Sequence, residues 1–211
     1  MGARKQLLNR HWLIHRPMAD ISNSPAAGAA LDLENENALL RASLADLQSR
    51  YADLERRVES DPLTGLPDRR RFLAEVERAV GQAQRHGTPS AVLFIDVNGL
   101  GRINHARGFL AGDAALVHVA AQLSALIRAT DTVARIGGDS FGLILDHLDP
   151  NSAIETSERL ARCIAAAPAD LGGSQASVTV SIGVTSILPG DSVEEVMRRG
   201  ARNVGLAKEE G

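Results

Sequence analysis

Hydrophobic residues recur with a seven-residue period between residues 33 and 58. The recurring positions, in chain order, are Leu33, Asn37, Leu40, Leu44, Leu47, Tyr51, Leu54 and Val58. Alternating spacings of four and three define the d and a positions of a coiled coil, and a polar Asn at an a position often fixes two strands in register. The pattern predicts a parallel homodimeric coiled coil over residues 32–60. The alternative is a single amphipathic helix folded against its own domain.

Residues 1–31 lack this period. Basic residues surround a short apolar stretch over residues 7–14, and residues 22–30 are mostly small. We expect a flexible terminal segment, and the alternative is a basic amphipathic segment that docks on a partner or a membrane surface.

Helical and strand periods alternate beyond residue 60. Helical periodicity predicts helices over about 70–86, 100–105, 113–128, 152–167 and 193–209. Runs of apolar and β-branched residues predict strands over 91–96, on both sides of Gly137-Gly138, and over 176–186. This order predicts an α/β sandwich with a mixed, largely antiparallel central sheet flanked by helices.

Two carboxylates follow predicted strands directly. Asp96 ends the apolar run 91–95, and Asp139 follows Gly137-Gly138, which predict a two-residue hairpin with positive φ angles. Two carboxylates at strand ends are suited to share one divalent cation.

Four motifs in this order resemble the GGDEF family of diguanylate cyclases. They are DPLTGLPDRR at 61–70, DVNGLGRIN at 96–104, GFLAGD at 108–113 and GGDSF at 137–141. The resemblance covers residues 60–211 and implies the nucleotidyl-cyclase-like palm fold. It places a GGDEF-like domain at residues 61–211, after the stalk at 32–60 and the flexible segment at 1–31.

The resemblance implies a reaction that joins two GTP molecules into cyclic di-GMP. Each 3′-hydroxyl attacks the other α-phosphate, so two domains must face each other and metal ions must neutralise the phosphates. The implied residues are Asp96, the Val97 carbonyl and Asp139 for Mg²⁺, Asn104 and Asp113 for the guanine base, and Lys208 for the terminal phosphates. Asp139 also belongs to the catalytic hairpin.

The fourth hairpin position departs from the family pattern, because Ser140 stands where Glu is usual. A serine hydroxyl has neither charge nor basicity at neutral pH, and losing a catalytic carboxylate commonly costs a factor of about 10² to 10⁴ in rate. Further departures are Asp68, Asn98, Leu100, Gly101, His105, Phe109, Ala201 and Gly205. We therefore expect weak cyclase activity or none.

An Arg-x-x-Asp pair, Arg128 and Asp131, has the spacing of the family's inhibitory site, where cyclic di-GMP binds, and Arg159 stands at the position of a further arginine. Guanidinium groups bind phosphate or a guanine edge in bidentate fashion, and a carboxylate accepts from guanine N–H groups. The alternative is structural: Arg128 ends a helix and pairs with Asp131.

Composition agrees with a cytoplasmic protein. Hydrophobic residues make up 44% of the 211 residues, and the single cysteine, Cys163, cannot form an internal disulfide. The formal net charge of -3 does not favour nucleic-acid binding, and we expect no apolar run of the roughly 18 residues that span a bilayer.

The sequence favours a dimeric, degenerate GGDEF domain that binds cyclic di-GMP or GTP as a sensor or scaffold in bacterial second-messenger signalling. One alternative is an active diguanylate cyclase that uses Mg²⁺. The other is a coiled-coil interaction protein that binds a protein partner and no nucleotide.

Overall fold

The computed structural model describes residues 25–209, with side-chain environments for 34–50 and 59–209. The chain divides into two compact units between Asp53 and Leu54. The family-like motifs all lie in the second unit.

The first unit is built on one long helix, α1 (Pro25–Val58). It begins seven residues before the predicted stalk, because proline is favourable in the first helical turn and residues 26–30 are mostly alanine, the best helix former. Leu40, Leu44 and Leu47 are 63%, 56% and 64% exposed on this single chain. The rest of the predicted flexible segment, residues 1–24, lies outside the described residues, as do the environments of Leu33, Tyr51, Leu54 and Val58.

The second unit is a sandwich around a four-stranded antiparallel sheet of order β2-β3-β1-β6. Its principal elements are α2 (Arg69–His86), β1 (Ser90–Val97), α3 (Leu100–Arg107), α4 (Phe109–Leu126), β2 (Thr132–Arg135), β3 (Ser140–Asp146), α5 (Pro150–Ala166), β6 (Val180–Ile187) and α6 (Val193–Glu209). The predicted sandwich with a largely antiparallel sheet is confirmed.

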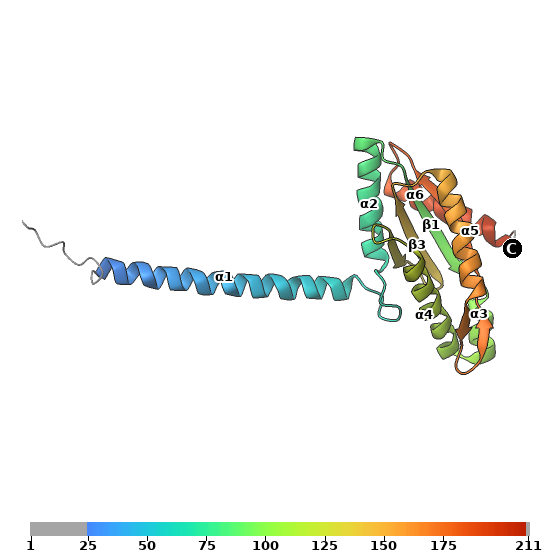
Figure 1. Ribbon diagram of the computed structural model, residues 1–211, viewed down its shortest axis with the longest axis horizontal. Helices are drawn as coiled ribbons and strands as arrows, with labels where there is room; N and C mark the ends of the chain where they lie inside the picture. Colours follow the sequence, from blue (N-terminus) through green and yellow to red (C-terminus); the bar gives the residue numbers. More distant parts are fainter. Residues whose placement is uncertain (1–24, 210–211) are drawn as a thin grey trace, which may run out of the picture. The chain divides into compact units, whose positions relative to one another are not determined.

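Each face of the sheet is covered by a pair of helices (Figure 1). Val92 and Phe94 of β1 pack with α2 and α6, whereas Leu93 and Ile95 pack in a second core with α4 and α5. This alternation follows from the two-residue period of a strand and places Asp96 on the α2 and α6 face.

Helix α4 differs from the sequence expectation in two ways. It begins at Phe109, four residues before the predicted start. Gly108, with φ 84°, separates the end of α3 from the start of α4. The helix is also long and apolar enough to cross a membrane by length and composition, which corrects the expectation of no such segment. Its Ala115, Val119 and Leu123 side chains are nevertheless buried in the core, as in a core helix of a globular domain.

The connection between β2 and β3 corrects the predicted two-residue hairpin. Four residues, 136–139, separate the strands, and neither Gly137 nor Gly138 has a positive φ. Four-residue hairpin loops are usually built on a type I turn, which needs no left-handed residue. The predicted strand 176–186 is divided between β5 (Gln175–Ser177) and β6, and β5 pairs with β4 (Pro168–Asp170), which was not predicted.

Candidate functional site

Asp61, in the opening motif of the domain, is linked to the β2–β3 loop through Arg135. Asp61 accepts hydrogen bonds from the Thr64 backbone and hydroxyl at 2.8 and 2.7 Å. The Arg135 guanidinium donates to both Asp61 carboxylate oxygens at 3.1 Å and to the Gly138 carbonyl at 2.7 Å. Partial burial tends to raise the pKa of Asp61, but the hydrogen bonds from Thr64 and Arg135 bring it below its ordinary value. The sequence reasoning did not assign this supporting role to Asp61 and Arg135.

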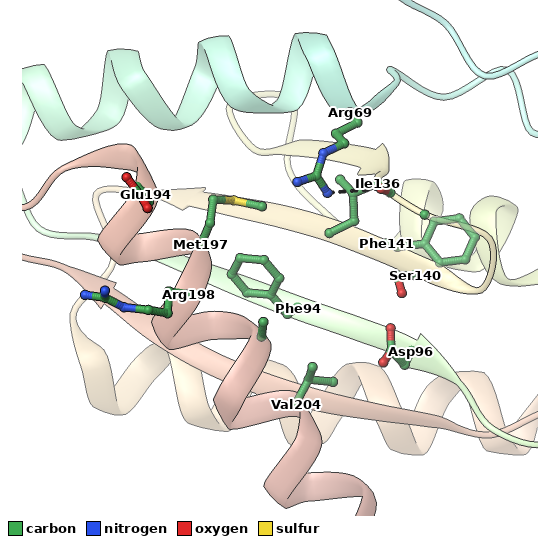
Figure 2. A pocket seen from close by; sticks show the side chains of 12 residues that line it. Arg69, Phe94, Asp96, Ile136, Ser140, Phe141, Glu194, Met197, Arg198 and Val204 are labelled. Carbon is green, nitrogen blue, oxygen red and sulfur yellow. Dashed lines mark hydrogen bonds between the residues drawn. The ribbon is translucent and has the colours of Figure 1, made fainter.

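The loop brings the predicted metal-binding residues to one point. Asp96 and Ser140 are directly opposite each other in the β1–β3 register, and their side chains face each other in Figure 2. The Val97 amide donates to the Asp139 carbonyl at 3.0 Å, which places these two residues side by side. The Ser140 hydroxyl lies 3.4 Å from an Asp139 carboxylate oxygen. Ser140 therefore occupies the position from which a longer acidic side chain reaches both aspartates.

Lys208, from the last turns of α6, joins this group across 112 positions of sequence. Its Nζ lies 2.8 Å from Asp96 Oδ2. The hydrogen bond that Lys208 donates to Asp96, together with the charges of Asp96 and Asp139, raises the pKa of Lys208 despite partial burial. Both carboxylates therefore stabilise the charged form of the Lys208 ammonium group.

The oxygen donors fit Mg²⁺ when a nucleotide phosphate completes the coordination. Within residues 34–50 and 59–209 no three His, Cys, Asp or Glu side chains form a metal-binding group. Two carboxylates and the Val97 carbonyl remain, and Mg²⁺ is often held by one or two carboxylates with water and substrate phosphates. The donor set suits a magnesium–triphosphate complex better than the bare ion.

A polar cavity of about 440 Å³ lies beside these residues, and its walls include Asp139, Arg102 and Lys208. The Arg102 guanidinium folds over Gly99, where an added Cβ would lie 2.9 Å from Arg102 Nη2. Arg102 was missed from the sequence because the resemblance points to the neighbouring position, Gly101. In the same wall Asn98 bonds to β6, accepting from the Ser181 hydroxyl at 2.9 Å. We call this space the reaction cleft.

The two predicted guanine-binding residues lie on adjacent helices that pack together, Asn104 on α3 and Asp113 on α4. Asn104 Oδ1 is buried and has no hydrogen-bond partner in the described chain. It lies over Gly112, where a Cβ would be only 1.8 Å from it. A buried acceptor without a donor is uncommon and is satisfied when a ligand supplies an N–H group.

The predicted inhibitory-site residues line one small cavity of about 130 Å³, which we call the arginine cavity. Arg128 and Asp131 come from the turn after α4, and Arg159 comes from α5. Asp131 accepts from the Arg128 backbone amide at 3.0 Å, and neither arginine forms an ion pair within the described residues.

Asp146, at the end of β3, is a further member of the arginine cavity that the sequence did not single out. One carboxylate oxygen accepts from Arg78 Nη2 at 2.8 Å, whereas Oδ1 is buried without a partner among the described residues. Asp146 joins this wall only in the folded chain, because the end of β3 lies near the turn after α4 and near Arg159 of α5.

The family model for the diguanylate cyclase GGDEF domain matches residues 58–211. The chain belongs to this family. Among curated relatives, the bifunctional diguanylate cyclase/cyclic di-GMP phosphodiesterase MucR of Pseudomonas aeruginosa is 35% identical over 75% of this chain and 22% of its own length. Diguanylate cyclase TpbB of the same species is 35% identical over 72% of this chain and 36% of its own length. The chain therefore spans about a fifth to a third of these GGDEF proteins.

Solved GGDEF structures agree with the fold. The coiled coil and GGDEF domain of DgcB from Caulobacter crescentus, in complex with c-di-GMP, superposes with a TM-score of 0.76 at 25% identity, covering 85% of this chain and 95% of that one. Diguanylate cyclase SiaD of Pseudomonas aeruginosa, solved with its activator SiaC, gives 0.69 at 28% identity over 88% and 75% of the two chains. The second unit therefore has the fold of solved GGDEF domains.

Proposed function

We propose that this GGDEF domain acts as a dimeric cytoplasmic sensor or scaffold that binds cyclic di-GMP in the arginine cavity and makes little or none of it. The observation that carries the proposal is the arginine cavity itself. Two arginines without ion pairs in the described chain border a space that Asp131 also lines.

These groups suit a guanine dinucleotide. Arg128 and Arg159 provide planar donors for guanine O6 and N7 or for phosphate oxygens, and both can stack on a purine face. Asp131 provides an acceptor for the guanine N1–H and N2–H groups.

The reaction cleft supports binding better than turnover. Asp96, beside the cleft, with the Val97 carbonyl and Asp139 of its wall, would hold Mg²⁺, and Lys208 and Arg102 provide positive charge for the phosphates of GTP. When bound, Mg²⁺ neutralises the triphosphate and polarises the α-phosphate. Ser140 cannot accept the proton of the attacking 3′-hydroxyl, because a hydroxyl is not a base at neutral pH. Asn104 Oδ1 is suited to accept a guanine N–H in the same bound state.

The exposed leucines of α1 support a dimer. Leu40, Leu44 and Leu47 are each more than half exposed on one chain, and a second α1 helix would bury them in a seam. We expect sedimentation equilibrium to give a dimer at micromolar concentration and Leu47→Glu to shift it to a monomer. A monomeric wild-type protein contradicts this part of the proposal.

Calorimetric titration with cyclic di-GMP tests the proposal. Each lost charge-assisted hydrogen bond costs about 1.5 to 3 kcal/mol, so Arg128→Ala is expected to weaken binding by about 10- to 100-fold. Arg162→Ala is the matched control, because Arg162 lies one turn further along α5, pairs with Glu158 and is absent from the cavity wall. Absence of heat with the wild-type protein, or equal loss in both variants, contradicts the receptor.

The active-enzyme alternative has a separate test. Incubation with GTP and Mg²⁺, followed by chromatographic detection of cyclic di-GMP, is expected to show little or no product. Turnover that survives repeated purification and disappears in Asp139→Ala makes the protein a cyclase and contradicts the scaffold function.

A further inference from the structure

A second cavity adjoins the reaction site at Asp96 and Ser140, and the rest of its wall has no role in the functions above. It has a volume of about 550 Å³ and lies between α2 and α6 over the β1 and β3 strands (Figure 2). Cavities of roughly 300 to 1,000 Å³ are the usual size for small-molecule sites. It differs in chemistry from the polar reaction cleft, because its floor is largely apolar.

The cavity exists because both helices are held close to the sheet at other points. On α6, a Cβ at Gly200 would lie 1.9 Å from the Phe94 ring, and on α2 the Phe72 ring fills the space over Gly142. These close contacts set how far α6 and α2 lie from the sheet beside the cavity. The space between them stays open because short residues face it, including Gly137, Ser140 and Ala201.

The floor and the rim differ in polarity. Phe94, Ile136, Met197 and Val204 form the apolar surface. Figure 2 shows Met197 and Phe94 projecting into the centre of the view, between the polar groups at its ends. A ligand with an apolar body therefore removes hydrocarbon surface from water, at about 25 cal/mol per Å² buried.

The rim carries two arginines and two carboxylates, but their partners differ. Arg69 reaches over the cavity from α2, and its one hydrogen bond in the described chain, to the Ile136 carbonyl, is long at 3.5 Å. At the end away from Asp96, Arg198 lies on the same helix as Glu194 and interacts electrostatically with Glu195. Asp96 is paired with Lys208 at 2.8 Å. Arg69 is therefore the rim cation that an anionic ligand can pair with.

We propose that this cavity binds a small organic carboxylate with an apolar body, held by the Arg69 guanidinium over a floor of Phe94 and Met197. The site is separate from the arginine cavity, which lies on the α4 and α5 side of the sheet. It does not depend on cyclic di-GMP binding or on turnover.

The probe is 2-naphthoate, titrated into the full chain by calorimetry, with neutral 2-naphthamide as the matched ligand. We expect 2-naphthoate to bind at least about tenfold more tightly than the amide, because only the carboxylate pairs with Arg69. Arg69→Gln is expected to remove that difference. Arg85→Gln, at the other end of α2 and outside the cavity wall, is expected to keep it.

A cavity-filling variant makes the test independent of charge. Ala201 is exposed on α6, so Ala201→Leu is expected to fold, to block 2-naphthoate and to leave cyclic di-GMP affinity unchanged. Equal thermal unfolding midpoints for Ala201→Leu and the wild type show that the variant is folded, whether or not cyclic di-GMP binds. The inference is overturned if 2-naphthoate fails to bind, binds equally to Ala201→Leu, or is displaced competitively by GTP with Mg²⁺.

Discussion

The two ends of strand β3 differ in the charged groups around them. Ser140 begins the strand opposite Asp96, and Asp146 ends it at the arginine cavity, about 20 Å away at 3.4 Å per residue. Near Ser140, Lys208 is already paired with Asp96, whereas Arg128 and Arg159 of the arginine cavity form no ion pair within the described residues. Under the proposed function, chemistry and recognition therefore occupy separate places in the domain.

The largest predicted effect comes from restoring the missing carboxylate. Ser140→Glu places an acid opposite Asp96 and is expected to raise the rate of cyclic di-GMP formation by about 10²-fold, the lower end of a general-base contribution. The measurement is product formation at saturating GTP and Mg²⁺. Ser140→Gln is the control, because it has the same shape without the charge. Equal rates in the two variants mean that other departures, such as Gly101, limit the cleft.

The next largest effect, on the free energy of unfolding, concerns the ion pair between Asp61 and Arg135. Asp61→Asn leaves Arg135, whose side chain is only 14% exposed, without its carboxylate, and is expected to cost about 2 to 3 kcal/mol in unfolding free energy at pH 7. The pKa of Asp61 is lowered in the fold, so the wild-type advantage is present above its ordinary value of 3.8 and is lost as pH falls through the folded pKa. Urea unfolding at pH 7 and pH 3 checks this. A difference that stays constant between the two pH values contradicts the assignment.

Two glycine substitutions on helix α6 test whether the reaction cleft and the arginine cavity are independent of each other. Gly200→Ala brings a Cβ against the Phe94 ring and is expected to destabilise the fold by about 2 kcal/mol, shifting Lys208 relative to Asp96. Gly205→Ala, on the same helix with nothing within 4 Å of the new Cβ, is expected to stabilise it by about 0.5 to 1 kcal/mol. Denaturant melts measure both. Cyclic di-GMP affinity should change less than twofold in either variant, and a larger change means that the ends are coupled.

The smallest effect concerns the shape of the cation in the arginine cavity. Arg128→Lys keeps the charge and loses the planar fork, so we expect about tenfold weaker cyclic di-GMP binding than in the wild type. Titration at two salt concentrations checks this. If lysine binds as well as arginine, the contact is a simple charge attraction and not bidentate recognition.

The sequence predicted most of the fold because its signals were local. Helical periodicity located α2, α5 and α6 within a few residues, and the apolar run 91–96 located β1. The errors were also local in origin. Gly137-Gly138 suggested a tight turn, but the backbone uses a four-residue loop, and the three-residue strands β4 and β5 are too short to show a period.

The candidate site was predictable in residue type but not in environment. Motif spacing indicated Asp96, Asp139 and Lys208, yet nothing in the sequence shows that Lys208 lies 2.8 Å from Asp96. The unsatisfied oxygens of Asn104 and Asp146 depend on which neighbours the fold brings near them. The cavity between α2 and α6 depends on the spacing of these two helices, which no single segment encodes.

Hydrogen–deuterium exchange of the full chain, with and without cyclic di-GMP, tests the separation of recognition from chemistry most directly. The account predicts slower exchange in the turn over residues 126–131 and in the α5 segment that carries Arg159, with no change over residues 96–102 of the reaction cleft. Protection confined to residues 96–102, with the turn and α5 unaffected, would contradict it.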